Sequence, residues 1–506
     1  MRTRLLIRPV IDAYVLTYSI DSSNYLQFTT STTLQVGNTV VIDNITLPTI
    51  ITDITSVSNG LYTTSTSWYD DLPVGGTIVN VLNNSDPTQA PDETFDTLNS
   101  PNGPVYTVSE VLSDSSYLIG GAFGLYQGQS YSNMVRVNED GSVNSFFNNS
   151  TGFNDVVYTI AAQSNGDSYV GGMFTQYDGN SANKFIKLFS NGTIDTSFIV
   201  SSGFNDTVLA CIDSPSGPYV FGEFTSYGGS TKRGIVKLDE FGAIDNSNFN
   251  VSTGLGTSSY ATCGAIDKDE KLLVGGSFTS FNSDTCSNIM RLMQDGTFDN
   301  TFVQGSGFND VVNCIAVLST GDYMVGGMFT SYNGSSVSGI VKIRPNGSRN
   351  AIFSCTISGG AASILSISET NYGKFLISGN FTTVNGVTCN NLARINSDGT
   401  IDPTFTVPTG LDDTTFNIID SSDRYLIFGE YTEYQGEGVN FLLRIAEKLY
   451  SIRFAPVDLD LKEDLQFPLN FNIADIRTPQ NRKSNYSKTI DLPGTDKNSK
   501  VFAQLF

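Results

Sequence analysis

The chain has 506 residues, a net charge of −22 and no histidine. The lack of histidine excludes Ser-His-Asp and Cys-His catalysis and every histidine-ligated metal site. Residues 1–450 hold 20 Lys and Arg against 43 Asp and Glu, an acidity that repels phosphate and argues against nucleic acid as a partner. Residues 451–506 are nearly neutral, with 8 basic and 7 acidic residues.

The N-terminal stretch MRTRLLIRPVIDAY resembles neither a membrane span nor an export signal. Its apolar run is short and is broken by Arg8 and Pro9. We therefore expect no membrane association and no export by the general secretory route. The six cysteines lie far apart without a CxxC pair, so we expect them to be reduced and mostly buried: Cys211, Cys263, Cys286, Cys314, Cys355 and Cys389.

Residues 1–85 alternate between apolar and polar side chains, as in YLQFTTSTTLQVGNTVVIDNITL. This period of two predicts a small all-β domain. The stretch NNSDPTQAPDE that follows is rich in turn formers. We interpret residues 86–97 as a linker that ends in a strand belonging to the last unit of the next domain.

Residues 98–446 contain a repeat marked by a glycine, any residue and an aromatic residue. Successive aromatic positions are between 50 and 54 residues apart: Phe123, Phe174, Phe224, Phe278, Phe329, Phe381 and Tyr431. A period near fifty residues is typical of a solenoid, a propeller or an array. Each unit reads as hairpin-linked strands with an Asn-Gly or Asp-Gly turn such as Asn346-Gly347. Four such strands make one blade, so the sequence predicts a seven-bladed β-propeller.

The glycine-aromatic phrase occurs in all seven units, so it cannot define a single binding site. We expect its glycines to let the sheets approach closely and its aromatic side chain to fill the core between them. An aromatic residue three positions further on, such as Tyr332, extends this packing in most units. We therefore interpret the phrase as structural.

One basic residue occupies the same position in every unit: Arg136, Lys187, Lys237, Arg291, Lys342, Arg394 and Arg444. In the first six units an acid or amide follows eight residues later: Asn144, Asp195, Asp245, Asp299, Asn350 and Asp402. Across a tight turn, adjacent antiparallel strands bring such positions together. We expect structural pairs, because a charge on a covered sheet face needs a partner.

The seventh unit lacks its last strand and its acid. The missing piece stands before the first unit, where PDETFDT (91–97) mirrors QDGTFDN (294–300). The alignment predicts that the two ends of the ring pair and that Asp96 faces Arg444. Such pairing removes the two open sheet edges that an unclosed ring would have.

The units resemble the delta-60 repeat, as in KLLVGGSFTSFNSDTCSNIMRLMQDGTFDNTF. The glycine pair, the basic residue, the turn and the terminal Phe are all in register over about residues 92–446. This repeat is common in large bacterial surface and secreted proteins. The resemblance implies a β-propeller and no particular catalytic activity.

Residues 447–506 form a third part, in which Gly494 is the only glycine. NIADIRTPQNRKSNYSKTIDLPGTDKNSKVF is similar to a segment of tail and baseplate-associated proteins of crAss-like bacteriophages that infect Bacteroidetes. The matching positions are Arg482, Ser487, Lys488, Pro493, Thr495, Asn498, Val501 and Phe502. The resemblance implies a β-rich or extended assembly segment.

Together these features predict a structural or adaptor protein of a phage tail, assembled in the host cytoplasm and carried in the virion. Its partners would be other tail proteins, bound through residues 451–506, and copies of itself in a symmetric ring. A host-surface glycan or protein is a further expected partner of the propeller. We expect no catalytic residues, metal or cofactor. A bacterial surface propeller that binds carbohydrate or protein is the alternative, and a propeller glycosidase, which needs a non-repeated cluster of acids, comes after it.

Overall fold

The computed structural model describes residues 91, 92, 95, 101–111, 114–147, 151–370, 373–405, 407, 409–420 and 424–446, apart from a few side chains. It also describes the backbone of six strands between residues 17 and 82 and of two strands near the C-terminus. All regular elements in these ranges are strands. The described ranges contain no helix that is long and apolar enough to cross a membrane.

The chain divides into two compact units, Met1–Ala455 and Pro456–Phe506. The first unit begins with an antiparallel six-stranded sheet in the order β1-β2-β5-β4-β3-β6. Its strands are β1 (Thr17–Ile20), β2 (Tyr25–Thr29), β3 (Thr39–Asn44), β4 (Leu47–Ser58), β5 (Leu61–Ser67) and β6 (Ile78–Leu82).

Residues 105–446 build a series of similar antiparallel three-stranded sheets. The first strands are β7 (Val105–Val111), β12 (Val157–Ala162), β17 (Val208–Ile212), β22 (Tyr260–Ile266), β27 (Val312–Val317), β33 (Ser363–Glu369) and β38 (Thr415–Asp420). The second strands are β8 (Ser116–Gly121), β13 (Ser168–Gly172), β18 (Tyr219–Gly222), β23 (Leu272–Ser277), β28 (Tyr323–Gly327), β34 (Phe375–Asn380) and β39 (Arg424–Gly429). The third strands are β11 (Met134–Val137), β16 (Phe185–Leu188), β21 (Ile235–Lys237), β26 (Ile289–Leu292), β31 (Ile340–Ile343), β37 (Leu392–Ile395) and β42 (Leu442–Ala446).

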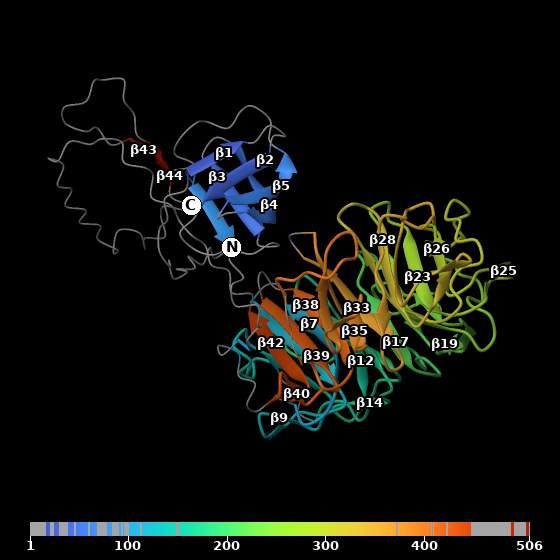
Figure 1. The fold of residues 1–506 in the computed structure, drawn as a ribbon. Coiled ribbons are helices and arrows are strands. Elements are labelled where there is room, and N and C mark those ends of the chain that lie inside the picture. Colours follow the sequence, from blue (N-terminus) through green and yellow to red (C-terminus); the bar gives the residue numbers. More distant parts are fainter. Residues whose placement is uncertain are drawn as a thin grey trace. The chain divides into compact units, whose positions relative to one another are not determined.

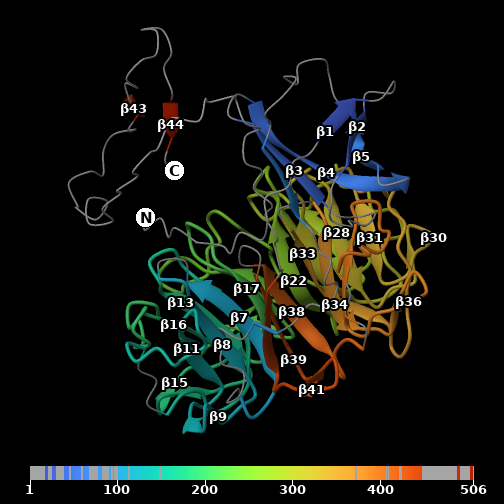
Figure 2. The ribbon, with the colours of Figure 1, turned by 60° about the vertical axis from the view of Figure 1, so that its left-hand side comes forward.

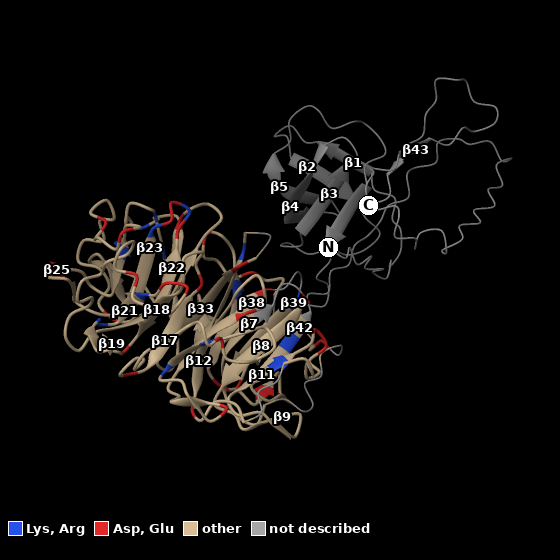
Figure 3. Ribbon diagram, turned by 180° about the vertical axis from the view of Figure 1, so that it is seen from behind, with Lys and Arg blue, Asp and Glu red and all other residues tan. Residues whose placement is uncertain are grey.

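Each first strand contacts the first strand of the next sheet, and β38 at the end of the series contacts β7 at its start. The first strands therefore form a closed inner circle, and Figures 1 and 2 show the orange β38 beside the blue β7. A buried cluster joins the ends of the series, with Val105 and Ile119 against Leu426 and Phe428. Acidic residues lie mainly in the loops between the strands (Figure 3).

Short hairpins link the second and third strands in each sheet. They are β9 (Leu125–Tyr126) with β10 (Gln129–Ser130), β14 (Gln176–Tyr177) with β15 (Asn180–Ser181), β19 (Ser226–Tyr227) with β20 (Ser230–Thr231), β24 (Ser280–Phe281) with β25 (Asp284–Thr285), β29 (Ser331–Tyr332) with β30 (Ser335–Ser336), β35 (Thr383–Val384) with β36 (Val387–Thr388), and β40 (Glu433–Tyr434) with β41 (Glu437–Gly438). One further strand, β32 (Ile357–Ser358), pairs with β35.

The expected fourth strand of each unit is reduced to an isolated β-bridge, such as Leu188↔Ile194 or Leu292↔Phe298. The Asp or Asn that follows the bridge, eight residues after the repeated basic residue, turns the chain away from the sheet. In the second unit, for example, the Asp195 carboxylate accepts the backbone N–H of Ser197 at 2.9 Å. This local hydrogen bond competes with a continued ladder, and the strand ends after one pair.

The second compact unit contains two short strands, β43 (Ser487–Thr489) and β44 (Phe502–Gln504). They are antiparallel, with Ser487 opposite Gln504 and Thr489 opposite Phe502. Three of the positions that match the phage-tail segment lie on these strands: Ser487, Lys488 and Phe502. The other matching positions lie outside the described residues: Arg482, Pro493, Thr495, Asn498 and Val501.

Candidate functional site

The aromatic residues of the repeated phrase belong to the core. Phe123, Phe174, Phe224, Phe278, Phe329, Phe381 and Tyr431 are all no more than 3% exposed. In three of the units the ring packs on a Phe that precedes the first strand, with Phe174 at 4.4 Å from Phe153, Phe224 at 4.5 Å from Phe204 and Phe329 at 4.2 Å from Phe308. Buried rings of this kind are not accessible to a ligand.

The glycine pair in this phrase allows two close approaches of the backbone. A Cβ on Gly172 would lie 2.1 Å from the carbonyl oxygen of Val156, just before β12. A Cβ on Gly171 would lie 2.5 Å from Cγ1 of Val208 on β17, the first strand of the next sheet. The close approach expected from the sequence is therefore present at these positions.

In four units the tyrosine three positions after the aromatic ties the hairpin to the turn that follows the third strand. The Tyr332 hydroxyl donates to the carbonyl of Gly347 at 2.5 Å, and Tyr126 donates in the same way to Gly141. Val384 has no hydroxyl, and there Asn385 Nδ2 donates to the equivalent carbonyl of Gly399 at 2.8 Å. Sequence reasoning assigned packing alone to this position. The constant spacing of 15 residues between Tyr and turn Gly could have revealed the hydrogen bond.

The repeated basic residues are paired with carboxylates, as expected in four units. Lys187, Lys237, Arg291 and Arg394 lie 3.2, 3.6, 2.8 and 2.6 Å from the acids eight residues later, Asp195, Asp245, Asp299 and Asp402. All eight side chains are at most 14% exposed. These pairs hold the third strand to the turn that follows it.

The expectation is wrong in the two units where an asparagine occupies that position. Arg136 pairs with Asp114 at 2.9 Å rather than with Asn144, and Lys342 lies 3.7 Å from Asp322 rather than pairing with Asn350. Both acids come from the turn before the second strand. An amide carries no charge, so the buried cation pairs with a carboxylate from the turn that precedes the neighbouring strand.

The closure of the ring also differs from the alignment. Pro91 bridges Ile445, and Asp92 pairs with Arg444, at 2.8 Å from Nε. Asp96 lies outside the described residues. The matching phrase is Asp-x-Thr-Phe, so Asp92 and Phe95 correspond to Asp299 and Phe302. The Phe ring explains this register, because the Arg444 guanidinium lies 4.7 Å from Phe95 as that of Arg291 lies 5.3 Å from Phe302.

A non-repeated group of side chains lies on the inner circle. Every first strand carries a β-bulge near its start, at the same position of each unit. The bulged residues are Tyr106, Tyr158, Leu209, Thr262, Asn313, Leu365 and Phe416. Three aromatic ones are adjacent around the circle: the Tyr106 ring lies 5.1 Å from that of Tyr158 and 4.7 Å from that of Phe416. We call Tyr106, Tyr158, Phe416 and Glu430 the inner aromatic cluster.

Acidic groups surround this cluster. Burial raises the pKa of Tyr106, and the negative charge of Glu430 raises it further. Burial and the charges of Asp155 and Glu223 do the same for Tyr158. Burial and Asp413 raise the pKa of Glu430. The rings and Glu430 are partly exposed, so this negative potential reaches the surface. Sequence reasoning missed the cluster, because its members lie on three different units.

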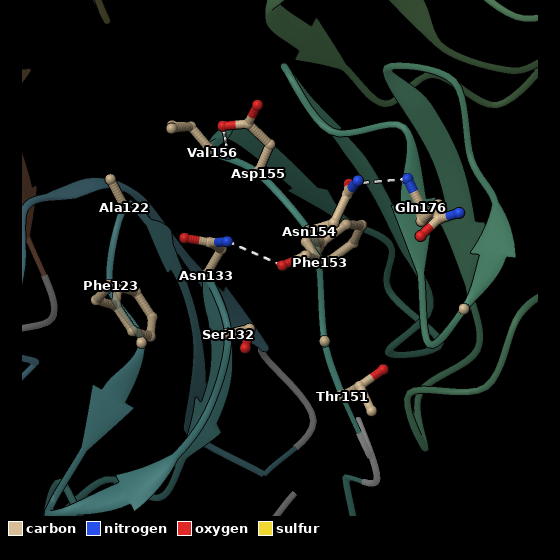
Figure 4. Close-up of a pocket in the computed structure, with 13 residues that line it drawn as sticks. Ala122, Phe123, Ser132, Asn133, Thr151, Phe153, Asn154, Asp155, Val156 and Gln176 are labelled. Atoms are coloured by element: carbon tan, nitrogen blue, oxygen red, sulfur yellow. Dashed lines mark hydrogen bonds between the residues drawn. The ribbon is translucent and has the colours of Figure 1, made fainter.

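A pocket of about 590 Å³ lies between the first two sheets (Figure 4). Asp155 belongs to its lining and is one of the acids near Tyr158. The opposite wall includes Asn133, whose Nδ2 donates to the carbonyl of Phe153 at 2.9 Å. Asn154 accepts the backbone N–H of Gln176 at 2.9 Å, which fixes the hairpin on the far side.

The described cysteines are free thiols, as expected. Burial raises the pKa of Cys211 and Cys263 to about 12, so the reactive thiolate form is not populated at neutral pH. Within the described ranges no three acidic or cysteine side chains are grouped so that they could hold a metal ion.

Comparison with known proteins identifies the repeat. Five segments match the family described as "Domain of unknown function (DUF5122) beta-propeller": 112–147, 163–198, 268–302, 318–353 and 373–405. The third and the last unit are not matched. The third has Phe241-Gly242 in place of an Asn-Gly or Asp-Gly turn, and the last is completed by residues near Asp92.

Among 22 solved chains that match is the WD40 β-propeller domain of Doa1, with 14% identity and a TM-score of 0.42 over 68% of this chain and 93% of that one. No curated protein matches. The family match and the closed series of sheets lead to one conclusion: residues 91–446 of this all-β chain form a β-propeller.

Proposed function

We propose that the protein is a structural and adaptor component of a bacteriophage tail. In this role a seven-bladed propeller of the delta-60 type is a rigid interaction module, and residues 451–506 are its anchor on the tail. The protein catalyses no reaction in this role.

The way the repeated residues are used supports a scaffold. The repeated aromatic rings are buried, and the repeated cations have carboxylate partners within the ring, as for Arg394 with Asp402. Side chains engaged in this way stabilise the disk and are not free to bind a partner. Function on such a fold is expected in the parts that do not repeat.

The C-terminal segment is the observation that carries the assignment to a tail. Its phrase from Arg482 to Phe502 resembles tail and baseplate-associated proteins, and the strand pair β43–β44 brings Thr489 opposite Phe502 within that phrase. The segment has 8 basic and 7 acidic residues, in contrast to the acidic body. Residues 451–506 carry more apolar side chains than so short a segment can readily bury alone, which favours docking on another tail protein or on copies of itself.

The test is incorporation into virions. Wild-type protein and the variant Phe502→Asp are expressed in the phage host during infection, and purified virions are analysed by mass spectrometry and electron microscopy. We expect the wild type in the tail and a loss of the variant. The control is Phe241→Asp, which changes a side chain that is 58% exposed on the propeller and should leave incorporation intact.

Two results would overturn the proposal. One is a protein found in the bacterial envelope and absent from virions, which would favour a surface propeller. The other is full incorporation of a chain that ends at residue 450, which would show that the segment after it is not the anchor.

A further inference from the structure

The bulged positions differ in kind around the inner circle. On β38, β7 and β12 the bulged residue is aromatic, whereas on β22 and β27 it is a small polar residue, Thr262 or Asn313. The polar residues bond to the neighbouring first strand: Thr262 Oγ1 donates to the carbonyl of Val312, and Asn313 Nδ2 to that of Ile364. A bulge redirects a side chain away from the sheet ladder. Two neighbouring bulges thus join strands and three others carry rings, while the bulges on β17 and β33 carry Leu209 and Leu365.

The rings of the inner aromatic cluster are held at angles to one another. Tyr106 and Tyr158 are inclined at 64°, and Tyr106 and Phe416 at 38°. A flat stacking platform for a sugar ring would need coplanar or singly exposed rings. All three rings are partly exposed, and an exposed aromatic face carries negative potential that attracts a cation.

Backbone hydrogen bonds hold the main chain of Glu430 and the carboxylates of Asp155 and Asp413 near the cluster. The N–H of Glu430 donates to the Thr414 carbonyl at 2.9 Å, and the Asp155 carboxylate accepts the N–H of Val156 at 2.8 Å. The Asp413 carboxylate accepts the N–H of Thr414 at 2.7 Å. The resulting negative charge complements a cation and repels an anionic ligand.

We propose that the inner aromatic cluster, together with the pocket beside Asp155, binds an organic cation of the alkylammonium or guanidinium class. The cation lies against the exposed parts of Tyr106, Tyr158 and Phe416, with Glu430 and Asp155 as its counter-charges. The pocket of about 590 Å³ is in the usual size range of ligand sites and receives the chain that bears the cation. The source of this group is a Lys or Arg side chain of a partner protein or a free amine. The site uses only residues of the propeller, so it does not depend on the role of the C-terminal segment.

The experiment is a binding titration of the purified full-length chain. Ligand-observed NMR and calorimetry are run with tetramethylammonium, with a blocked lysine (Nα-acetyl-lysine methylamide) and with its neutral isostere Nα-acetyl-norleucine methylamide. We expect saturable binding of the two cations and none of the norleucine compound. Tighter binding of the blocked lysine than of tetramethylammonium would identify a protein side chain as the source, and the reverse order a free amine.

Variants locate the site. Tyr158→Leu removes a ring at similar volume, and Glu430→Gln removes a charge at the same size. Each should weaken cation binding about threefold to tenfold, the range that a partly desolvated cation–π contact implies. Asp155→Asn should also weaken binding. Its matched control is Asp310→Asn, because Asp310 accepts the N–H of Val311 at 2.8 Å in the same way but lies in a unit without an aromatic bulge.

Thermal unfolding of each variant shows whether weaker cation binding comes from a folding defect or from loss of the binding site. Cation binding that is unchanged in folded Tyr158→Leu and Glu430→Gln, or equally weakened by Asp310→Asn, would overturn the proposal. Absence of saturable binding of both cations to the wild type would overturn it as well. Neither result would affect the incorporation test described above.

Discussion

Closure of the ring by Asp92 can be tested by removing its carboxylate. The Arg444 side chain is 1% exposed, and its Nε lies 2.8 Å from Asp92 Oδ2. Asp92→Ala leaves this buried guanidinium without that carboxylate, and removal of one partner of a buried pair costs about 3–5 kcal/mol. Asp92 also lies 3.5 Å from Arg424, which is 34% exposed and adds little because solvent screens it.

The assay is urea unfolding of the full-length chain followed by far-ultraviolet circular dichroism. We expect the free energy of unfolding to fall by about 3–5 kcal/mol in Asp92→Ala. The double variant Asp92→Ala/Arg444→Met should recover much of this loss, because an apolar side chain of similar length leaves no buried charge. The exposed variant Asp269→Ala is the control and should change stability by less than about 0.5 kcal/mol.

The outcome also decides between two alignments of the N-terminal strand. A loss below about 1 kcal/mol in Asp92→Ala would refute the pairing argued from the structure. A large loss in Asp96→Ala, together with a small one in Asp92→Ala, would restore the register expected from the sequence.

Three further predictions concern the repeated contacts. Lys237→Ala should lower the free energy of unfolding by about 3–5 kcal/mol, since it leaves Asp245 buried without its cation; an unchanged urea midpoint would contradict this. Tyr332→Phe should cost about 1–3 kcal/mol in the same assay, because the buried carbonyl of Gly347 loses its donor, and no loss would show that water replaces the hydroxyl. Burial raises the pKa of Asp402, but the charges of Arg394 and Lys374 outweigh it and leave that pKa below its usual value. Its stabilisation is therefore complete above the unfolded pKa near 4 and is lost as the pH falls further. The urea midpoint should thus drop between pH 5 and pH 2.5, and in Asp402→Asn the drop should be smaller; equal drops would contradict the assignment.

The repeat could be derived from the sequence because its causes are local. Glycine at a close backbone approach, as at Gly172, and an aromatic residue two positions later recur at a fixed period. The pairing of Arg291 with Asp299 follows from a tight turn between adjacent strands. Contacts of this kind span few residues, so spacing alone is enough to identify them.

Other features depended on the tertiary structure. The partners of Arg136 and Lys342 come from the turn before the neighbouring strand, because a buried cation needs a carboxylate and the residue at the expected spacing is an asparagine. The register at Arg444 is set by the Phe95 ring, which packs against its guanidinium. An alignment of the Thr-Phe-Asp triplets in 91–97 and 294–300 could not reveal this contact. The expected fourth strand was shortened by acid side chains that bond to their own backbone.

The inner aromatic cluster is the feature that sequence patterns were least able to predict. Tyr106 and Phe416 are more than 300 residues apart in the chain, and no pattern in the sequence relates them. They meet because β38 contacts β7 when the ring closes, and because a bulge redirects each side chain from its strand. The sequence by itself determined the units and their internal contacts, which arise within about fifty residues. Only ring closure decided which non-repeated side chains lie together, because that depends on the distance between strands at opposite ends of the chain.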